Sequence, residues 1–94
     1  MTMDINIKTK KIIFSGNVQG VGFRFNTWRF ARKLKLTGWV QNDSEGTVTV
    51  IAQGEEKNIK ALINYLKLLY KQNIEEIKEE NITLQNCQKF EIKK

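Results

Sequence analysis

Apolar residues along this chain change their spacing several times, from an alternating pattern to a helical one and back. Thr47–Gln53 alternates, with every second residue apolar from Val48 to Ala52. Because strand side chains alternate between two faces, this segment predicts a half-buried strand. Gly54-Glu55-Glu56 then opens a helical stripe, with acids where the helix dipole favours them. The stripe has the spacing of one helix face and consists of Ile59, Leu62, Ile63, Leu66, Leu69 and Tyr70.

The segments before this pair follow the same logic. Lys11–Gly16 is a short apolar run and predicts a strand. Phe23–Leu36 predicts a helix, because residues 23, 30, 31 and 34 are apolar and share a face with Thr27. Thr37–Asn42 predicts a second strand, and a hairpin-type turn at residues 43–46 joins it to the alternating segment.

The segments after the second helix are less clear. Ile74–Gln85 fits a strand better near its end than near its start, and Lys89–Lys93 fits a short final strand. The resulting order is strand, helix, strand, strand, helix, strand, with room for one extra short strand. This order predicts an α+β fold, the ferredoxin-like α/β sandwich (βαββαβ), with one antiparallel sheet and both helices on one face.

Length and composition set the wider frame. A chain of 94 residues is expected to be a single domain over 1–94, with residues 1–9 as a loose N-terminal tail. Its one cysteine, Cys87, cannot form an intramolecular disulfide, which fits a reducing, cytoplasmic compartment. No apolar run approaches 18 residues, so we expect no membrane span. No histidine is present, which excludes any mechanism that needs an imidazole base or histidine metal ligands.

The chain is basic, with 16 Lys plus Arg against 10 Asp plus Glu and a net charge of +6. Such a charge favours an anionic partner, which could be a phosphate group, a nucleic acid or a membrane surface. Lysines spread over a solvated surface, with no anionic partner, would give the same net charge. Charge therefore limits the possible ligands without choosing among them.

A glycine-rich segment between the first strand and the first helix carries the chemistry. Gly16–Gly22 contains three glycines in seven residues and must be a loop. Such a loop can turn backbone N–H groups inward as an anion nest, and the following helix adds its own free N–H groups. Arg24 lies in the first helical turn, where a cation is unfavourable unless an anion binds. By itself this pattern is also compatible with a tight turn that only needs positive φ angles.

The segment GNVQGVGFR, Gly16–Arg24, resembles the signature of the acylphosphatase family at every defined position. A second family element, Gly-Trp-Val and then Asn, corresponds to Gly38–Asn42. Gly46–Gly54 is similar to the family as well. The resemblance covers Lys11–Leu69 well and is loose from Tyr70 to Gln88.

The resemblance implies roles for individual residues. Arg24 would be the catalytic arginine that binds the substrate phosphate, and Asn42 the catalytic asparagine that holds the attacking water. Thr27 would support the site or simply pack within the helix. The phosphate-binding loop would comprise Asn17, Val18, Gln19, Gly20, Val21, Gly22 and Phe23.

The implied function is hydrolysis of the carboxyl–phosphate bond of an acyl phosphate by in-line attack of a water. An acyl phosphate releases a carboxylate whose conjugate acid has a pKa of about 4, so no general acid is needed. Nothing in the sequence resembles a cluster of carboxylates that would bind Mg²⁺, so we expect no metal and no cofactor. The expected ligands are a small acyl phosphate and inorganic phosphate, bound by a monomer. The alternatives are a non-catalytic phosphate-binding module and an RNA-binding module of the same fold. The second lacks the expected stacking aromatics on Thr47–Gln53.

Overall fold

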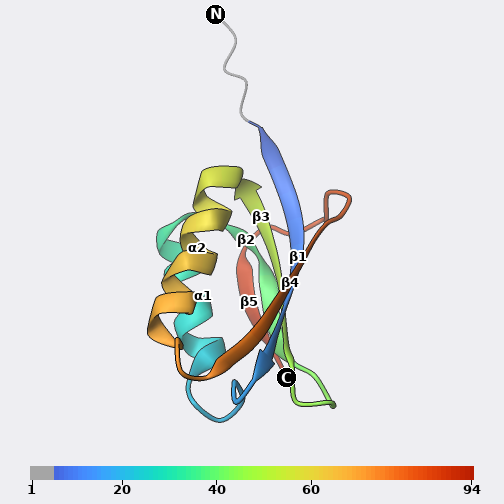
Figure 1. The fold of residues 1–94 in the computed structure, drawn as a ribbon. Coiled ribbons are helices and arrows are strands. Elements are labelled where there is room, and N and C mark those ends of the chain that lie inside the picture. Colours follow the sequence, from blue (N-terminus) through green and yellow to red (C-terminus); the bar gives the residue numbers. More distant parts are fainter. Residues whose placement is uncertain (1–5) are drawn as a thin grey trace, which may run out of the picture.

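The computed structural model describes residues 6–94, and these residues form a helical layer on one face of a sheet (Figure 1). The predicted ferredoxin-like α+β class is confirmed. No helix in this part of the chain is long and apolar enough to cross a membrane. The elements in order are β1 (Ile7–Gly16), α1 (Phe23–Lys33), β2 (Thr37–Asn42), β3 (Val48–Glu55), α2 (Glu56–Leu69), β4 (Ile74–Asn81) and β5 (Phe90–Lys93).

The sheet is mixed, with the strand order β4-β1-β3-β2-β5. The first four strands are antiparallel neighbours, whereas β5 is parallel to β2, with Phe90 opposite Gly38. The prediction of a wholly antiparallel sheet was therefore wrong at this edge. The physical reason is directional: β2 already runs opposite to β4, so a chain that turns back after β4 and reaches the β2 edge must run parallel to β2.

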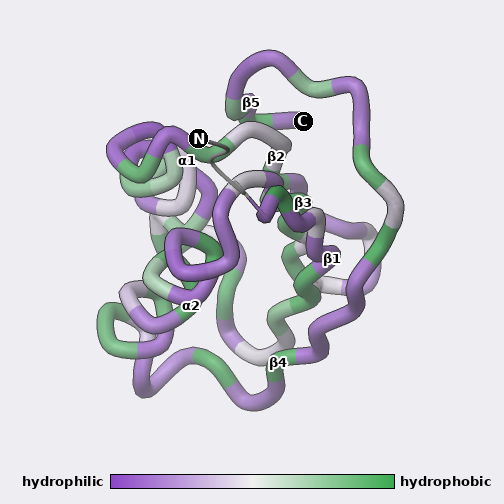
Figure 2. The backbone as a smooth tube through the Cα atoms, turned by 90° about the horizontal axis from the view of Figure 1, so that it is seen from above, coloured by the Kyte–Doolittle hydropathy of each residue, from purple (hydrophilic) through white to green (hydrophobic). Residues whose placement is uncertain are grey.

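The segment between β4 and β5 crosses from one edge of the sheet to the other and arches away from the two layers (Figure 2). The Gln53 side chain holds it in place, because its amide donates to the Gln85 carbonyl (3.1 Å) and its oxygen accepts from the Gln85 N–H (2.7 Å). At the far end, the Gly38 N–H donates to the Lys89 carbonyl (3.1 Å). These bonds deliver β5 to the β2 edge.

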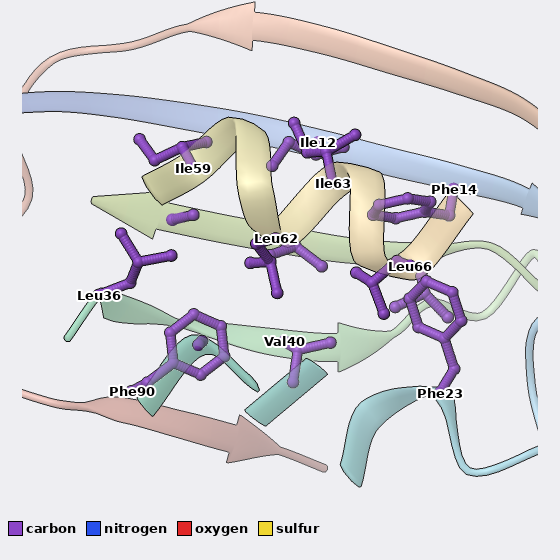
Figure 3. Packing of buried hydrophobic residues seen from close by; sticks show 14 of the residues in the cluster. Ile12, Phe14, Phe23, Leu36, Val40, Ile59, Leu62, Ile63, Leu66 and Phe90 are labelled. Carbon is purple, nitrogen blue, oxygen red and sulfur yellow. The ribbon is translucent and has the colours of Figure 1, made fainter. Parts of the chain in front are cut away.

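One hydrophobic core lies between the helices and the sheet (Figure 3). The core face of α2 follows the predicted stripe at Ile59, Leu62, Ile63 and Leu66. Leu69 departs from the prediction, because it is 48% exposed where the helix ends, whereas Tyr70 is buried in the core as predicted. The strands contribute alternate residues, including Ile12, Phe14, Val40, Val48, Val50 and Ala52.

Helix α1 ends at Lys33, three residues earlier than predicted. Lys35 adopts a left-handed conformation with φ of 59°, and the Leu36 N–H donates back to the Ala31 carbonyl (3.0 Å). This is the six-to-one bond of a Schellman motif, normally marked by a glycine that is absent here. The early turn allows Leu36, which is 3% exposed, to join the core before β2 begins.

The fourth strand also differs from its prediction. The strand occupies Ile74–Asn81, at the start of the expected segment and not near its end. Only Ile74 and Ile77 reach the core from this edge strand, whereas Leu84, beyond it, is 66% exposed. Charged residues at most other positions are usual for an edge strand, which must resist pairing with another chain. Apolar spacing was therefore a poor guide here.

The first strand begins earlier than predicted. β1 starts at Ile7 and pairs with β3 from that residue onward, with Thr9 opposite Gln53. Residues 7–9 are thus part of the sheet, and the expected loose tail is shorter than 1–9. The rest of that expectation, over 1–5, lies outside the described residues.

Candidate active site

The loop between β1 and α1 is anchored at its start by Asn73. The Asn17 N–H donates to the Asn73 carbonyl (2.9 Å), and the Asn73 side-chain amide donates to the Asn17 carbonyl (3.0 Å). A Cβ on Gly16 would overlap the Asn73 carbonyl, and Gly16 has a φ of 121°. The strand therefore ends at a point where only glycine fits. The backbone polar groups of Asn17 serve this anchor.

The middle of the loop presents backbone N–H groups that have no backbone acceptor within the described part of the chain. Among residues 6–94, no backbone carbonyl accepts a hydrogen bond from the N–H groups of residues 18–22. Gly20 and Gly22 have φ angles of 76° and 80°, the left-handed conformation that turns successive N–H groups to one side. The loop is therefore suited to an anion, as its glycines predict.

The start of α1 adds the positive end of the helix dipole to the N–H groups of the loop. Gly22 is the N-cap, it has no side chain that could cap the helix, and the first turn carries no acidic residue. The first turn instead carries Arg24, whose side chain is half-buried and donates through one terminal nitrogen to the Lys93 carbonyl (3.1 Å). This bond steadies the guanidinium while its other donors stay available. Free N–H groups, the helix dipole and Arg24 together favour an anion here.

Asn42 reaches the same place from the end of β2. The Gln19 side chain joins the two segments, because its amide donates to the carbonyls of Asp43 (2.8 Å) and Thr47 (2.9 Å) in the β2–β3 turn. That turn is itself ordered by the Asp43 carboxylate, which accepts from the hydroxyls of Thr47 (2.8 Å) and Thr49 (2.7 Å). The loop and the end of β2 are thus held together by hydrogen bonds that do not involve the Asn42 side chain.

These elements enclose an open pocket of about 220 Å³. It brings together both predicted catalytic residues, Arg24 and Asn42, with four of the seven predicted loop residues: Val18, Gly20, Gly22 and Phe23. The side chains of Val18 and Phe23 are buried in the core, so these two residues can offer an anion only their backbone. Asn17, Gln19 and Val21 do not line the pocket.

Several residues around the site had no signal in the sequence. The Tyr70 hydroxyl donates to the Val21 carbonyl (3.1 Å) and accepts from the Asn26 side chain (2.8 Å), which braces the loop against the end of α2. Phe25 and Ile92 line the pocket beside Arg24. Tyr70 and Ile92 are brought here from distant segments, whereas Phe25 directly follows Arg24 in the chain. An aromatic residue at the end of an apolar helix face, such as Tyr70, is usually a core residue, so the sequence did not indicate its contact with the loop.

Thr27 occupies the position that the sequence left open between site support and helix packing. Its side chain is fully buried, and its hydroxyl donates to the Phe23 carbonyl one turn earlier (2.7 Å). It therefore acts within the helix, where it steadies the first turn that carries Arg24. It does not line the pocket.

A ferredoxin-like fold whose glycine-rich loop and first helix start lie beside an arginine defines the class of protein by fold and by a site suited to an anion. The sequence profile of the Acylphosphatase family matches residues 10–92. An acylphosphatase of Vibrio vulnificus is 41% identical over 87 residues, which cover 92% of this chain and 97% of that protein. An acylphosphatase of Bacillus licheniformis is 42% identical over 87 residues, covering 87% and 93%.

Solved structures give the same result. The structure of an acylphosphatase from Coxiella burnetii matches with a TM-score of 0.85 at 31% identity, and covers 98% of this chain and 100% of that chain. The chain belongs to the acylphosphatase family.

Proposed function

We propose that this protein hydrolyses the carboxyl–phosphate bond of acyl phosphates, with Arg24 and Asn42 as its catalytic residues. The observation that carries the proposal is the shared pocket, in which a loop of free N–H groups, an arginine and an asparagine meet. Family membership supports the reaction, and the geometry supports the roles of these residues.

The loop and Arg24 would bind the phosphoryl group. A dianion in the pocket would receive hydrogen bonds from the N–H groups of residues 18–22 and from the Arg24 guanidinium, whose planar fork matches two phosphate oxygens. Phosphoryl transfer needs mainly positioning and stabilisation of charge on the equatorial oxygens. Preformed donors supply both without reorganising during the reaction.

Asn42 would hold the attacking water. Its side chain takes no part in the hydrogen bonds that fix the loop to the β2–β3 turn, so its amide can bind a water molecule. An amide does not act as a base at neutral pH, and it contributes by orienting the water in line with the phosphorus. The proton of the water passes to a phosphate oxygen of the substrate.

The leaving group requires little from the protein. A carboxylate with a conjugate-acid pKa of about 4 departs without a proton. The pocket lining accordingly contains no carboxyl, thiol or phenol side chain. This reaction needs residues that stabilise charge and does not need residues that transfer protons.

We also propose that the protein works as a monomer in the cytoplasm. The single cysteine argues for a reducing compartment, because no internal disulfide can form. Arg24 and Asn42 line the same pocket within a single copy of the chain, so the proposed site needs no residue from a second copy. RNA binding is not favoured: the central strands carry Lys11, Ile13, Thr49 and Ile51 on the face away from the core, and none of these can stack on a base.

The test is hydrolysis of benzoyl phosphate by the purified protein and its Asn42→Ala variant. The wild type should release benzoate and phosphate, and Asn42→Ala should lower kcat about a hundredfold, as loss of one preorganised group does. The inhibition constant of inorganic phosphate should stay the same, because Asn42 is proposed to contact only the water.

Asn64→Ala is the matched control, because Asn64 is an exposed asparagine on α2. It should leave both constants unchanged. A higher KM with an unchanged kcat in Asn42→Ala would make Asn42 a binding residue. Absence of acyl phosphate hydrolysis by the wild type would overturn the proposed function itself.

A further inference from the structure

One side of the pocket is apolar and exposed. Phe25, in the first turn of α1, is 54% exposed, and Ile92, in β5, is 41% exposed. Both line the pocket that also contains Arg24 and Asn42. Neither residue takes part in the phosphate-binding chemistry proposed above. Among residues 6–94, the other exposed large apolar residues do not line this pocket: Ile7, Val21, Leu68, Leu69 and Leu84.

The apolar side of the pocket continues away from Arg24. The Phe25 ring packs against Trp28, with ring centroids 5.8 Å apart and planes tilted by 35°. The Arg32 guanidinium lies over the Trp28 ring, 5.0 Å from its centroid, which restrains the indole. Trp28 and Ile92 both line a neighbouring hollow of about 500 Å³. Phe25, Trp28 and Ile92 thus form an apolar strip that links the pocket to this hollow, whose lining also includes the charged residues Arg32, Lys89 and Glu91.

We propose that this apolar strip receives the acyl group of the substrate and makes the enzyme selective for aromatic or larger apolar acyl phosphates over acetyl phosphate. This inference rests on the proposed function. With the phosphoryl group held by the loop, the acyl group must project from the open side of the pocket, where Phe25 and Ile92 are the apolar side chains it meets. Covering them removes apolar surface from water, and a methyl group is too small to do so.

The experiment compares kcat/KM for benzoyl phosphate with that for acetyl phosphate. The ratio of kcat/KM for benzoyl phosphate to kcat/KM for acetyl phosphate should fall about tenfold in Phe25→Ala and a few-fold in Ile92→Ala. This is the range expected when part of an apolar contact is lost. The kcat/KM for acetyl phosphate should change little. Phe25→Leu should keep most of the selectivity, because it retains apolar surface. Leu84→Ala, which removes an exposed apolar side chain far from the pocket, is the control and should change nothing.

A binding measurement makes the test independent of turnover. Calorimetry with phenyl phosphate and with inorganic phosphate should show tighter binding of phenyl phosphate to the wild type, and this preference should disappear in Phe25→Ala while phosphate affinity is retained. Selectivity that is unchanged in both Phe25→Ala and Ile92→Ala would overturn the inference and leave the proposed function standing. Equal losses with both substrates would also overturn it, because Phe25 would then merely support the helix start. A wild type inactive toward both substrates would instead refute the proposed function.

Discussion

The two helices lie on the same face of one sheet, yet their N-terminal ends differ in electrostatics. Helix α2 begins with an acid, Glu56, in its first turn, and buries four large apolar residues. Helix α1 begins at a glycine without a side-chain cap, has no acid in its first turn and carries Arg24 there. Its fully buried positions are fewer: Phe23, Thr27 and Ala31.

This difference assigns different tasks to the helices. The start of α2 satisfies its own dipole, so the helix can serve stability through its buried face. The start of α1 leaves positive potential unmatched, which costs the free protein stability and becomes favourable when an anion binds. The comparison can be tested by changing each helix and measuring activity and stability separately.

The largest effect is expected at the start of α1. Arg24→Ala should lower kcat/KM for acyl phosphate hydrolysis about a thousandfold, because a charged donor to the transferred phosphoryl group is lost. Stability without ligand should stay the same or rise slightly, because a cation leaves the positive end of the helix. Kinetics and thermal unfolding of the same preparations would measure both. Arg24→Lys should not restore activity, because an ammonium lacks the planar fork.

Phosphate binding gives this variant a second readout. In the wild type, a hundredfold excess of phosphate over its Kd should add about 2.7 kcal/mol to the free energy of unfolding, and Arg24→Ala should lose most of this gain. Arg29→Ala, an exposed arginine on the same helix, is the control and should keep it. Equal stabilisation by chloride at the same ionic strength would mean general screening of the net charge of +6, and would contradict a specific site.

The buried face of α2 should show the reverse behaviour. Leu66 is fully buried, so Leu66→Ala should lower the free energy of unfolding by about 3 kcal/mol through lost burial and a cavity. Activity per folded molecule should remain close to wild type, because α2 contributes no residue to the pocket. Urea unfolding and assays well below the midpoint would test this. Leu68→Ala, at a position 78% exposed, should change stability by less than about 0.5 kcal/mol.

The smallest effect is expected at the start of α2. Glu56→Gln should lower stability by about 0.5 kcal/mol, because it removes a negative charge from the positive end of the helix dipole. The loss should shrink in concentrated salt, which screens the charge. Urea unfolding at low and high ionic strength would measure it. A stability gain would show that the negative charge of Glu56 does not stabilise the start of α2.

The parts of the site predicted from sequence lie close together along the chain. The loop with its glycines and Arg24 falls within nine consecutive residues, Gly16–Arg24, and its local conformations follow from residue type. The role proposed for Asn42 rests on the family resemblance of a second motif, and the pocket brings Asn42 together with Arg24. The Gln19 bridge could not be predicted, because a glutamine in a loop shows nothing of the distant carbonyls it binds.

The sequence alone determined the kinds and order of the elements and the chemistry of the loop, because helix spacing, turn residues and a cation at a helix start act over a few neighbouring positions. Tertiary structure decided the parallel β5, the early end of α1 and the apolar side of the pocket. The parallel β5 and the apolar side of the pocket depend on segments far apart: Arg24 meets the Lys93 carbonyl across 69 positions, and Ile92 reaches the pocket only because β5 pairs with β2. The early end of α1 is a local turn, but it brings Leu36 into the core that the whole domain forms. Such contacts are set by how the whole sheet packs, and no local pattern records them.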